Sequence, residues 1–374
     1  MLTRIALVCC LITNVVLAQT TDPKQEALFD AARKKFVAKD FPGARTDISQ
    51  YLTSNPRNKV AYDLRGQIRM SQEDWYGAIS DFTAAIELDS TYADALNHRG
   101  ASKTNLGDDE SAIDDLDRAI RHNPKMAEAY TNRGFAFYNL EDLQSAYFDF
   151  SKALELGPAD ADKYFNRGVV KAELGEYVSA IDDYSKAIET EKTDPSLFNY
   201  RGVARYQTGN YEEAILDYDQ AIKLDPKDPL KFENRALART AKEDFKGALE
   251  DYNKSIELNA EDPETYNLRG VLKHTLQDYD GAIVDFGKAI ELDETNPTYF
   301  DNRALSRTEK EDYAGAVDDY SSSLMLFPND PETYYQRGLV KLQMNNNYDG
   351  CLDLKRADEL GSTEAKAAIK KNCK

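Results

Sequence analysis

Histidine and cysteine are scarce in this chain of 374 residues, which contains three histidines and four cysteines. His98, His122 and His274 lie far apart in the sequence and share no metal-ligand spacing. The sequence also lacks a glycine-rich phosphate loop, a G-x-S-x-G segment and a paired cysteine and histidine. We therefore expect no catalytic residue, no metal site and no cofactor, and we predict that the protein is not an enzyme.

Positively charged residues are fewer than negatively charged ones. The chain has 47 Lys and Arg and 66 Asp and Glu, which gives a net charge of −19. Nucleic acids and anionic membranes attract proteins through positive charge, so this balance argues against non-specific binding to either. A basic or neutral partner remains open, as does the simpler interpretation that an acidic surface keeps the chain soluble. Proline is also sparse, with 12 residues, and 41% of residues are hydrophobic, which favours a folded, helical chain.

The first 18 residues have the pattern of a secretory signal peptide. Arg4 supplies the positive start, and the apolar run IALVCCLITNVVLA follows it. Val16 and Ala18 occupy the positions of small residues that precede a signal cleavage site. The sequence thus predicts a signal peptide at 1–18, cleavage after Ala18, and a secreted or periplasmic protein.

Two other interpretations of this leader are weaker. A membrane anchor is disfavoured because the apolar run is short for a span and Asn14 interrupts it. Lipid attachment at Cys9 is disfavoured because valine, rather than a small residue, precedes it. After cleavage we expect no membrane span, and the remaining cysteines are Cys351 and Cys373.

One residue pattern returns every 34 residues along the chain. Its most regular member is a glycine or alanine, here called the marker. The markers are Ala32, Gly66, Gly100, Gly134, Gly168, Gly202, Ala236, Gly270, Ala304 and Gly338. An aromatic residue or leucine lies four residues before each marker, a small residue lies twelve after it, and an aromatic or aliphatic residue lies sixteen after it. Ten copies in unbroken register indicate a repeat array rather than two or three compact domains.

Each copy of the pattern predicts two helices. In the copy around Gly168, one helical face runs from residue 164 to 174, and Gly-Glu at 175–176 ends it. From Tyr177 onward, apolar residues recur at i, i+3, i+4, i+7 and i+8, the spacing of an amphipathic helix. Gly168 and Ala180 are small enough to let the two helix axes cross closely. The neighbouring aromatic residues then fill the space beside the crossing.

These columns of small and aromatic residues at a 34-residue period resemble the tetratricopeptide repeat family over about residues 25–360. The resemblance implies an all-α fold: an α-solenoid of about ten helix-turn-helix repeats that form a right-handed superhelix. The C-terminal segment resembles the end of exported bacterial members and implies a capping helix. We divide the chain into a signal peptide at 1–18, a divergent repeat at 19–58, nine repeats at 59–360 and a capping helix at 361–374.

Members of this family serve mainly as protein- or peptide-binding scaffolds, with a concave groove that the first helices line. The resemblance places eight residues of this chain in the groove: Asn132, Asn166, Asn234, Asn302, Tyr200, Phe135, Tyr138 and Tyr206. Asparagine offers both donors and acceptors to an extended peptide. We therefore expect a protein or peptide partner, with a glycan- or cell-wall-binding module that uses the groove aromatics as the alternative. The lysines that hold carboxylate tails in one subfamily are missing here.

Two charged columns depart from the usual family pattern. Arginine directly precedes nine of the markers, and aspartate lies fifteen residues after all ten. A base on one helix and an acid on the next suggest a ladder of ion pairs along the array. This ladder is either a structural device, with the arginine stems covering apolar surface, or a stripe that binds anions or glycans.

The two cysteines that remain after cleavage are predicted to form a disulfide. The last repeat helix ends near Gly361, and the capping helix runs back antiparallel to it from Thr363 to Asn372. Cys351 lies ten residues before this turn and Cys373 twelve after it, so the two lie at nearly the same height. Two free thiols are the alternative if the chain stays in a reducing compartment.

Overall fold

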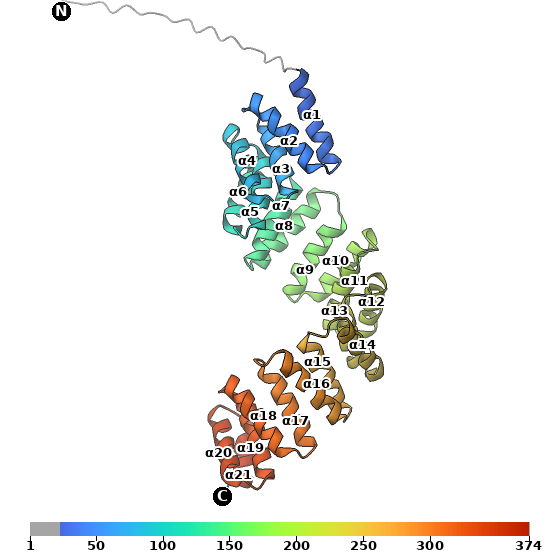
Figure 1. The fold of residues 1–374 in the computed structure, drawn as a ribbon, viewed down its shortest axis with the longest axis vertical. Coiled ribbons are helices and arrows are strands. Elements are labelled where there is room, and N and C mark those ends of the chain that lie inside the picture. The colour runs from blue at the N-terminus through green and yellow to red at the C-terminus, as the bar shows by residue number, and fades with distance from the viewer. Residues whose placement is uncertain (1–22, 374) are drawn as a thin grey trace, which may run out of the picture. The chain divides into compact units, whose positions relative to one another are not determined.

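The structure is a computed structural model, and it describes residues 23–373 of the chain. The predicted signal peptide therefore lies outside the described residues. The described chain divides into two compact units, and the division falls between Ala159 and Asp160. Figure 1 labels the helices that belong to them. Unit 1 comprises helices α1–α8 and unit 2 comprises helices α9–α21, with no strand among the described residues.

Ten pairs of helices and one final helix make up the described chain. In unit 1 they are α1 Pro23–Val37, α2 Phe41–Ser54, α3 Lys59–Met70, α4 Trp75–Leu88, α5 Ala93–Asn105, α6 Asp109–His122, α7 Ala127–Asn139 and α8 Leu143–Leu156. In unit 2 they are α9 Ala161–Glu173, α10 Tyr177–Thr190, α11 Pro195–Gln207, α12 Tyr211–Leu224, α13 Pro229–Ala241, α14 Phe245–Leu258, α15 Pro263–Thr275, α16 Tyr279–Leu292, α17 Pro297–Glu309, α18 Tyr313–Leu326, α19 Pro331–Gln343, α20 Asn347–Glu359 and α21 Thr363–Asn372. The predicted all-α, helix-pair architecture is confirmed.

Short polar signals start the helices of the repeats. The first helix α13 begins with Asp228 as its N-cap and Pro229 at its first position, where a missing N–H leaves no bond unmade. The second helix α16 begins with Asp278, whose carboxylate accepts a hydrogen bond from the Gly281 N–H at 3.0 Å. Because the same signals return every 34 residues, the helix boundaries repeat as well.

A left-handed residue ends the first helix of every repeat, seven positions after the marker. Glycine holds this position at Gly107, Gly175 and Gly209, where φ is 77–78°. Other residues hold it elsewhere with φ near 60°, among them Glu311. This conformation lets the following N–H reach back to the last turn of the helix, as Asp312 N does to Arg307 O at 2.9 Å. The turn between the two helices therefore has one geometry throughout the array.

The marker glycines permit close contact with the residue sixteen positions on, which is aromatic in most repeats. A Cβ atom built on Gly168 would lie 2.8 Å from the Tyr184 ring, and one on Gly66 would lie 2.4 Å from the Phe82 ring. Tyr184 is 1% exposed and Ala180 is fully buried, as the sequence predicts for residues at the helix crossing. The core of each unit is thus a row of small residues interleaved with aromatic rings.

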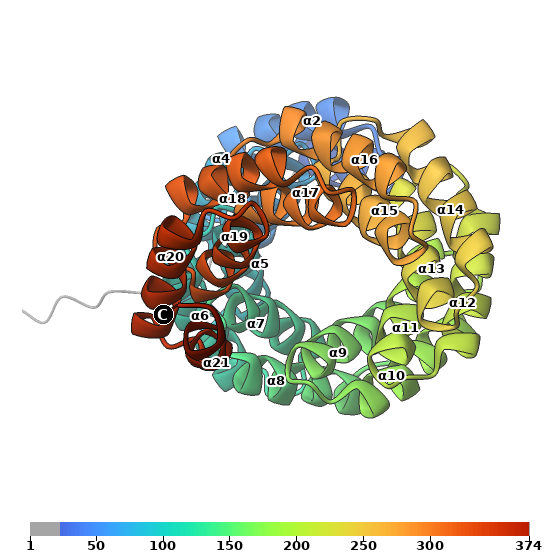
Figure 2. The ribbon, with the colours of Figure 1, turned by 90° about the horizontal axis from the view of Figure 1, so that it is seen from below.

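Within each unit the first and second helices lie on different sides. In unit 2 the first helices α9, α11, α13, α15, α17 and α19 lie on the inner side of the curved row of helices, and the second helices lie on the outer side (Figure 2). In unit 1, α5 and α7 likewise lie inside α6 and α8 (Figure 2). The exposed side of the first helices is called the inner face below.

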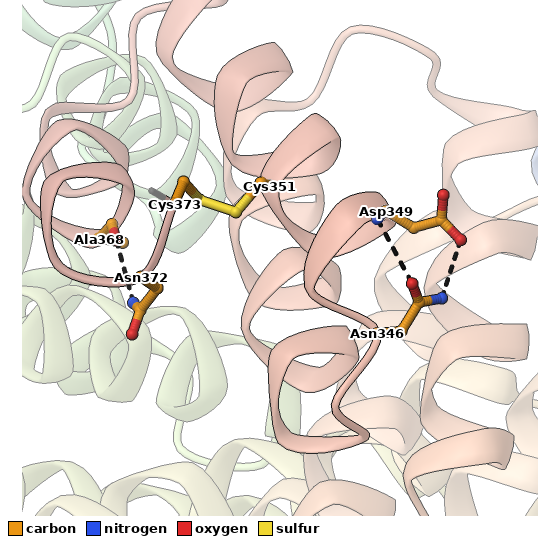
Figure 3. Close-up of a disulfide and its surroundings, with 6 residues drawn as sticks. All are labelled: Asn346, Asp349, Cys351, Ala368, Asn372 and Cys373. Atoms are coloured by element: carbon orange, nitrogen blue, oxygen red, sulfur yellow. Dashed lines mark hydrogen bonds between the residues drawn. A yellow bond between two sulfur atoms is a disulfide. The ribbon is translucent and has the colours of Figure 1, made fainter.

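The array ends in a covalently closed hairpin. Helix α21 packs against α20, and a disulfide joins Cys351 of α20 to Cys373, with 5.7 Å between the two Cα atoms (Figure 3). The Ser362 hydroxyl accepts a hydrogen bond from the Ala365 N–H and starts α21. Asn372 donates to the Ala368 carbonyl at 3.0 Å in the last turn before the disulfide (Figure 3). The apolar side of the last repeat is thus covered.

Candidate functional site

The arginine before each marker forms a bidentate ion pair with the aspartate of the second helix. In Arg99 the Nε–H donates to Asp115 Oδ2 at 2.8 Å and Nη2 donates to Asp115 Oδ1 at 2.6 Å. The pairs are Arg65–Asp81, Arg99–Asp115, Arg133–Asp149, Arg167–Asp183, Arg201–Asp217, Arg235–Asp251, Arg269–Asp285, Arg303–Asp319 and Arg337–Asp353. These aspartates are buried, so each needs a cationic partner. The ladder that the sequence suggests is therefore present as ion pairs.

The remaining nitrogen of several of these arginines reaches the preceding repeat. Arg99 Nη1 donates to the Thr83 hydroxyl at 3.0 Å, and Arg201 Nη1 donates to the Ser185 hydroxyl at 3.0 Å. The acceptor lies seventeen residues after the preceding marker in both cases. One guanidinium thereby ties two helices of its own repeat to a third helix. Its donors are occupied by protein, which favours the structural interpretation over an anion-binding stripe.

Most of these aspartates form an ion pair with a second cation. Asp149 does not, and its pKa is raised. Lys103 lies 2.7 Å from Asp115, and the two cations together keep the pKa of Asp115 below its usual value despite burial. Asp149 pairs with Arg133 alone, because Phe137 occupies the position of the second cation. Burial accordingly raises the pKa of the Asp149 carboxyl. The ladder is thus incomplete in the repeat that contains α7 and α8.

The asparagines predicted for the groove join consecutive first helices. Asn132 Nδ2 donates to Asn97 Oδ1 at 2.9 Å. The same contact recurs from Asn234 to Asn199 at 3.1 Å and from Asn302 to Asn267 at 2.8 Å. A histidine and an aspartate replace this pair between α5 and α3. The asparagine column therefore has a structural role, and the Oδ1 atoms of Asn132, Asn234 and Asn302 accept no hydrogen bond from any described residue.

The fourth asparagine and the predicted aromatic residues differ in exposure. Asn166 of α9 is half-buried. Phe135 is 38% exposed and Tyr200 is 43% exposed on the inner face. Tyr138 is half-buried, and so is Tyr206, which packs against the Tyr211 ring. The eight predicted residues thus share the first helices but do not form one continuous site.

A pocket of about 370 Å³ lies between α5 and α7 and brings two predicted residues together. Its lining residues are Ala101, Thr104, Asn105, Asn132, Phe135 and Asn139. We call this the α5–α7 pocket. Sequence reasoning missed Thr104, Asn105 and Asn139. Thr104 lies in the column of Tyr138 and Tyr206, four positions after a marker, and Asn105 and Asn139 lie in the next column. Including every member of these two columns would have found them.

A smaller pocket of about 110 Å³ lies between α17 and α19 in unit 2. Asp301 lines it with Leu305 and Gln336, and burial raises the pKa of Asp301 to about 6. The Thr333 hydroxyl donates to Asp301 at 3.2 Å, which ties α19 to α17. Neither unit gathers three His, Cys, Asp or Glu side chains as a metal site within the described chain. None of the helices from α1 to α21 is long and apolar enough to cross a membrane.

Three segments of the chain match known repeat families. Residues 202–240 match the TPR repeat, and residues 99–161 and 263–296 match the tetratricopeptide repeat. The chain is a tetratricopeptide repeat protein. The matched segments lie within the array of helix pairs described above, so the resemblance drawn from the 34-residue columns is confirmed.

This tetratricopeptide repeat protein is similar to several solved structures. YrrB, described as a TPR protein with an unusual peptide-binding site, is 24% identical over 48% of this chain and 92% of its own, with a TM-score of 0.45. Yeast Tom70 is 16% identical over 92% and 93% of the two chains, with a TM-score of 0.42. A tetratricopeptide repeat protein from Parabacteroides merdae is 20% identical over 64% and 94%, with a TM-score of 0.48. No curated protein sequence matches the chain significantly.

Proposed function

We propose that this tetratricopeptide repeat protein is an exported scaffold that binds a protein or peptide partner on the inner face of its first helices. The α5–α7 pocket is the observation that carries the proposal. It combines an exposed aromatic ring, Phe135, with the amides of Asn132, Asn105 and Asn139. An apolar surface beside a few directed polar groups is the usual composition of a site that holds a peptide side chain.

Export is supported by two independent features of the chain. The leader at 1–18 has the pattern of a secretory signal. The disulfide between Cys351 and Cys373 is of the kind that forms and persists in oxidising compartments. A secreted or periplasmic location accounts for both features.

The glycan alternative receives less support from the inner face. A sugar-binding platform needs exposed aromatic rings that lie in one plane. Tyr200 is the most exposed of the predicted groove aromatics, and its ring stands edge-on to Phe165 with an interplanar angle of 87°. We therefore retain the protein- or peptide-binding function as the single proposal.

Photo-crosslinking from the inner face tests the proposed function. A photoreactive phenylalanine derivative replaces Phe135, and the full chain is irradiated in the envelope of the cells that produce it. The matched control carries the same derivative at Tyr76, an outer aromatic residue of α4 that is 78% exposed. We expect a defined crosslinked partner from position 135 and none from position 76. A partner captured equally from both positions, or from position 76 alone, would contradict the proposal.

A further inference from the structure

We propose that the α5–α7 pocket receives the cationic side chain of a lysine or arginine from the bound partner. This inference deepens the proposed function and rests on it for the identity of the chain that carries the cation. The pocket contains exposed hydrogen-bond acceptors, an aromatic ring and a neighbouring buried carboxylate, and each of these favours a positively charged donor.

The three asparagines of the pocket use their amide nitrogens within the protein. Asn105 Nδ2 donates to the Ala101 carbonyl at 2.8 Å, and Asn132 Nδ2 donates to Asn97 Oδ1 at 2.9 Å. Asn139 Nδ2 donates to Asp109 Oδ1 at 3.1 Å. Their Oδ1 atoms accept no hydrogen bond from any described residue, so the pocket offers three free acceptors. These acceptors favour a ligand that donates several hydrogen bonds, as an ammonium or a guanidinium group does.

The hydroxyl of a fourth lining residue, Thr104, has no hydrogen-bond partner among the described residues. Thr104 Oγ1 is buried and makes no hydrogen bond within the described chain, although Thr104 lines the pocket. A buried polar atom without a partner is unfavourable, and a change of the Thr104 rotamer toward a bound donor would remove this penalty. The acceptors therefore favour an occupied pocket over an empty one.

The electrostatic surroundings favour a positive ligand over a neutral one. Asp109 accepts the hydrogen bond from Asn139, is only 7% exposed, and has no cation within 4.0 Å among the residues of the described range. Its carboxylate therefore lies one hydrogen bond away from Asn139, which lines the pocket. Phe135 also lines the pocket and is 38% exposed, and aromatic rings attract ammonium and guanidinium groups. The net charge of −19 attracts a basic partner over longer distances.

A small cation that resembles the lysine side chain, n-butylammonium, tests the pocket without a peptide. The purified full chain carries 4-fluorophenylalanine at position 135 and is titrated with n-butylammonium and, separately, with the neutral n-butanol. We expect a saturable change of the fluorine resonance with n-butylammonium, and binding of n-butanol that is weaker by about tenfold or more. Equal binding of the two compounds would overturn the proposal.

Two matched variants locate the effect within the array. Asn105→Lys places a positive charge in the pocket at an exposed position of α5, five residues after its marker. Gln207→Lys makes the same change of charge at the equivalent exposed position of α11. We expect n-butylammonium binding to be lost in Asn105→Lys and retained in Gln207→Lys. Equal effects of the two variants would overturn the proposal, because they would show a response to net charge alone.

Peptides separate this inference from the proposed function. Two nonapeptides that differ only by a central lysine or norleucine are added to the full chain, and protection of the inner face is followed by hydrogen exchange. Tighter binding of the lysine peptide, lost in Asn105→Lys, supports both proposals. Equal binding of the two peptides on the inner face overturns the pocket inference and leaves the proposed function standing. Entry of n-butylammonium without binding of either peptide contradicts the proposed function and leaves only the preference of the pocket for a cation standing.

Discussion

Gly287 of α16 leaves one arginine of the ladder without its third contact. For six arginines of the ladder, a hydroxyl, amide or carboxylate seventeen residues after the preceding marker accepts from Nη1, as Ser321 does from Arg337 at 2.9 Å. Gly287 occupies this position before Arg303, and a Cβ atom built on it would lie 3.7 Å from Arg303 Nη1, an ordinary contact. A serine would therefore fit without strain.

We expect Gly287→Ser to stabilise unit 2. The change removes a glycine from a helix interior and supplies a hydrogen-bond acceptor to Arg303, which together raise the free energy of unfolding by about 0.5–1.5 kcal/mol. Urea denaturation followed by circular dichroism measures the gain. Gly287→Ala is the control, since it changes helix propensity without adding an acceptor. A serine variant no more stable than the alanine variant would show that the third contact contributes nothing.

The single-cation site at Asp149 predicts a dependence of stability on pH. Burial raises the folded-state pKa of Asp149 above its unfolded value, so the folded chain loses stability as pH rises from the unfolded pKa through the folded one. Phe137→Lys restores the second cation and should lower the pKa of Asp149 and reduce this loss. Carbon-13 NMR of the Asp149 carboxyl across the acidic range measures the pKa.

The reciprocal change tests the same explanation at a complete site. Lys103→Phe removes the second cation from Asp115, so we expect the pKa of Asp115 to rise toward that of Asp149. If Phe137→Lys left the pKa of Asp149 unchanged, the missing cation would not be the cause of its shift.

At the scale of the helix pair, the turn after each first helix contains a strained residue in most repeats. Glu311 has φ 60°, a conformation that costs a residue with a Cβ atom about 1 kcal/mol or more. Glu311→Gly should therefore increase the free energy of unfolding by about 0.5–1 kcal/mol. Gly175→Ala is the opposite change. A Cβ atom at this position would have no atom within 4 Å, so only the left-handed backbone conformation makes alanine unfavourable there. Thermal unfolding of Glu311→Gly and Gly175→Ala should show shifts of opposite sign; shifts of one sign would contradict the account.

The C-terminal hairpin should depend on its disulfide. Terminal elements of a repeat array have only one neighbour and fray first. The disulfide closes 22 residues of chain, which corresponds to roughly 3 kcal/mol in the chain-entropy model. We expect Cys351→Ser to increase amide exchange in α21 far more than in α17. Thiol counting on the denatured, unreduced chain checks the bond itself, and two reactive thiols per mature chain would refute it.

At the scale of the whole molecule, the leader predicts where the mature chain begins. Cleavage after Ala18 would leave Gln19 as the first residue and remove Cys9 and Cys10 with the leader. Intact mass spectrometry of the exported protein should therefore give the mass of residues 19–374. A chain that retains residues 1–18 in the cytoplasm would contradict export and would remove the oxidising environment that the disulfide requires.

Local and periodic features of the fold were predictable from the sequence. The 34-residue period predicts the helix pairs, because a helix crossing needs a small residue and its neighbour must fill the space, as Gly168 and Tyr184 do. The Arg–Asp ladder was predictable because the arginine column and the aspartate column recur with the same 34-residue period. The cysteine pair was predictable because an antiparallel hairpin fixes the relative heights of residues 351 and 373.

Only the tertiary structure decided how the inner face uses its polar groups. The sequence by itself determined that asparagines recur on the first helices. It did not determine which neighbouring residue each asparagine side chain hydrogen-bonds. Packing of α7 against α5 directs the Asn132 donor to Asn97, and Asn132 lines the α5–α7 pocket. The partner of each side chain depends on distances between repeats, which arise from the packing of whole helices. A period within one chain therefore specifies the architecture, whereas the chemistry of the pocket follows from contacts between residues about 35 positions apart.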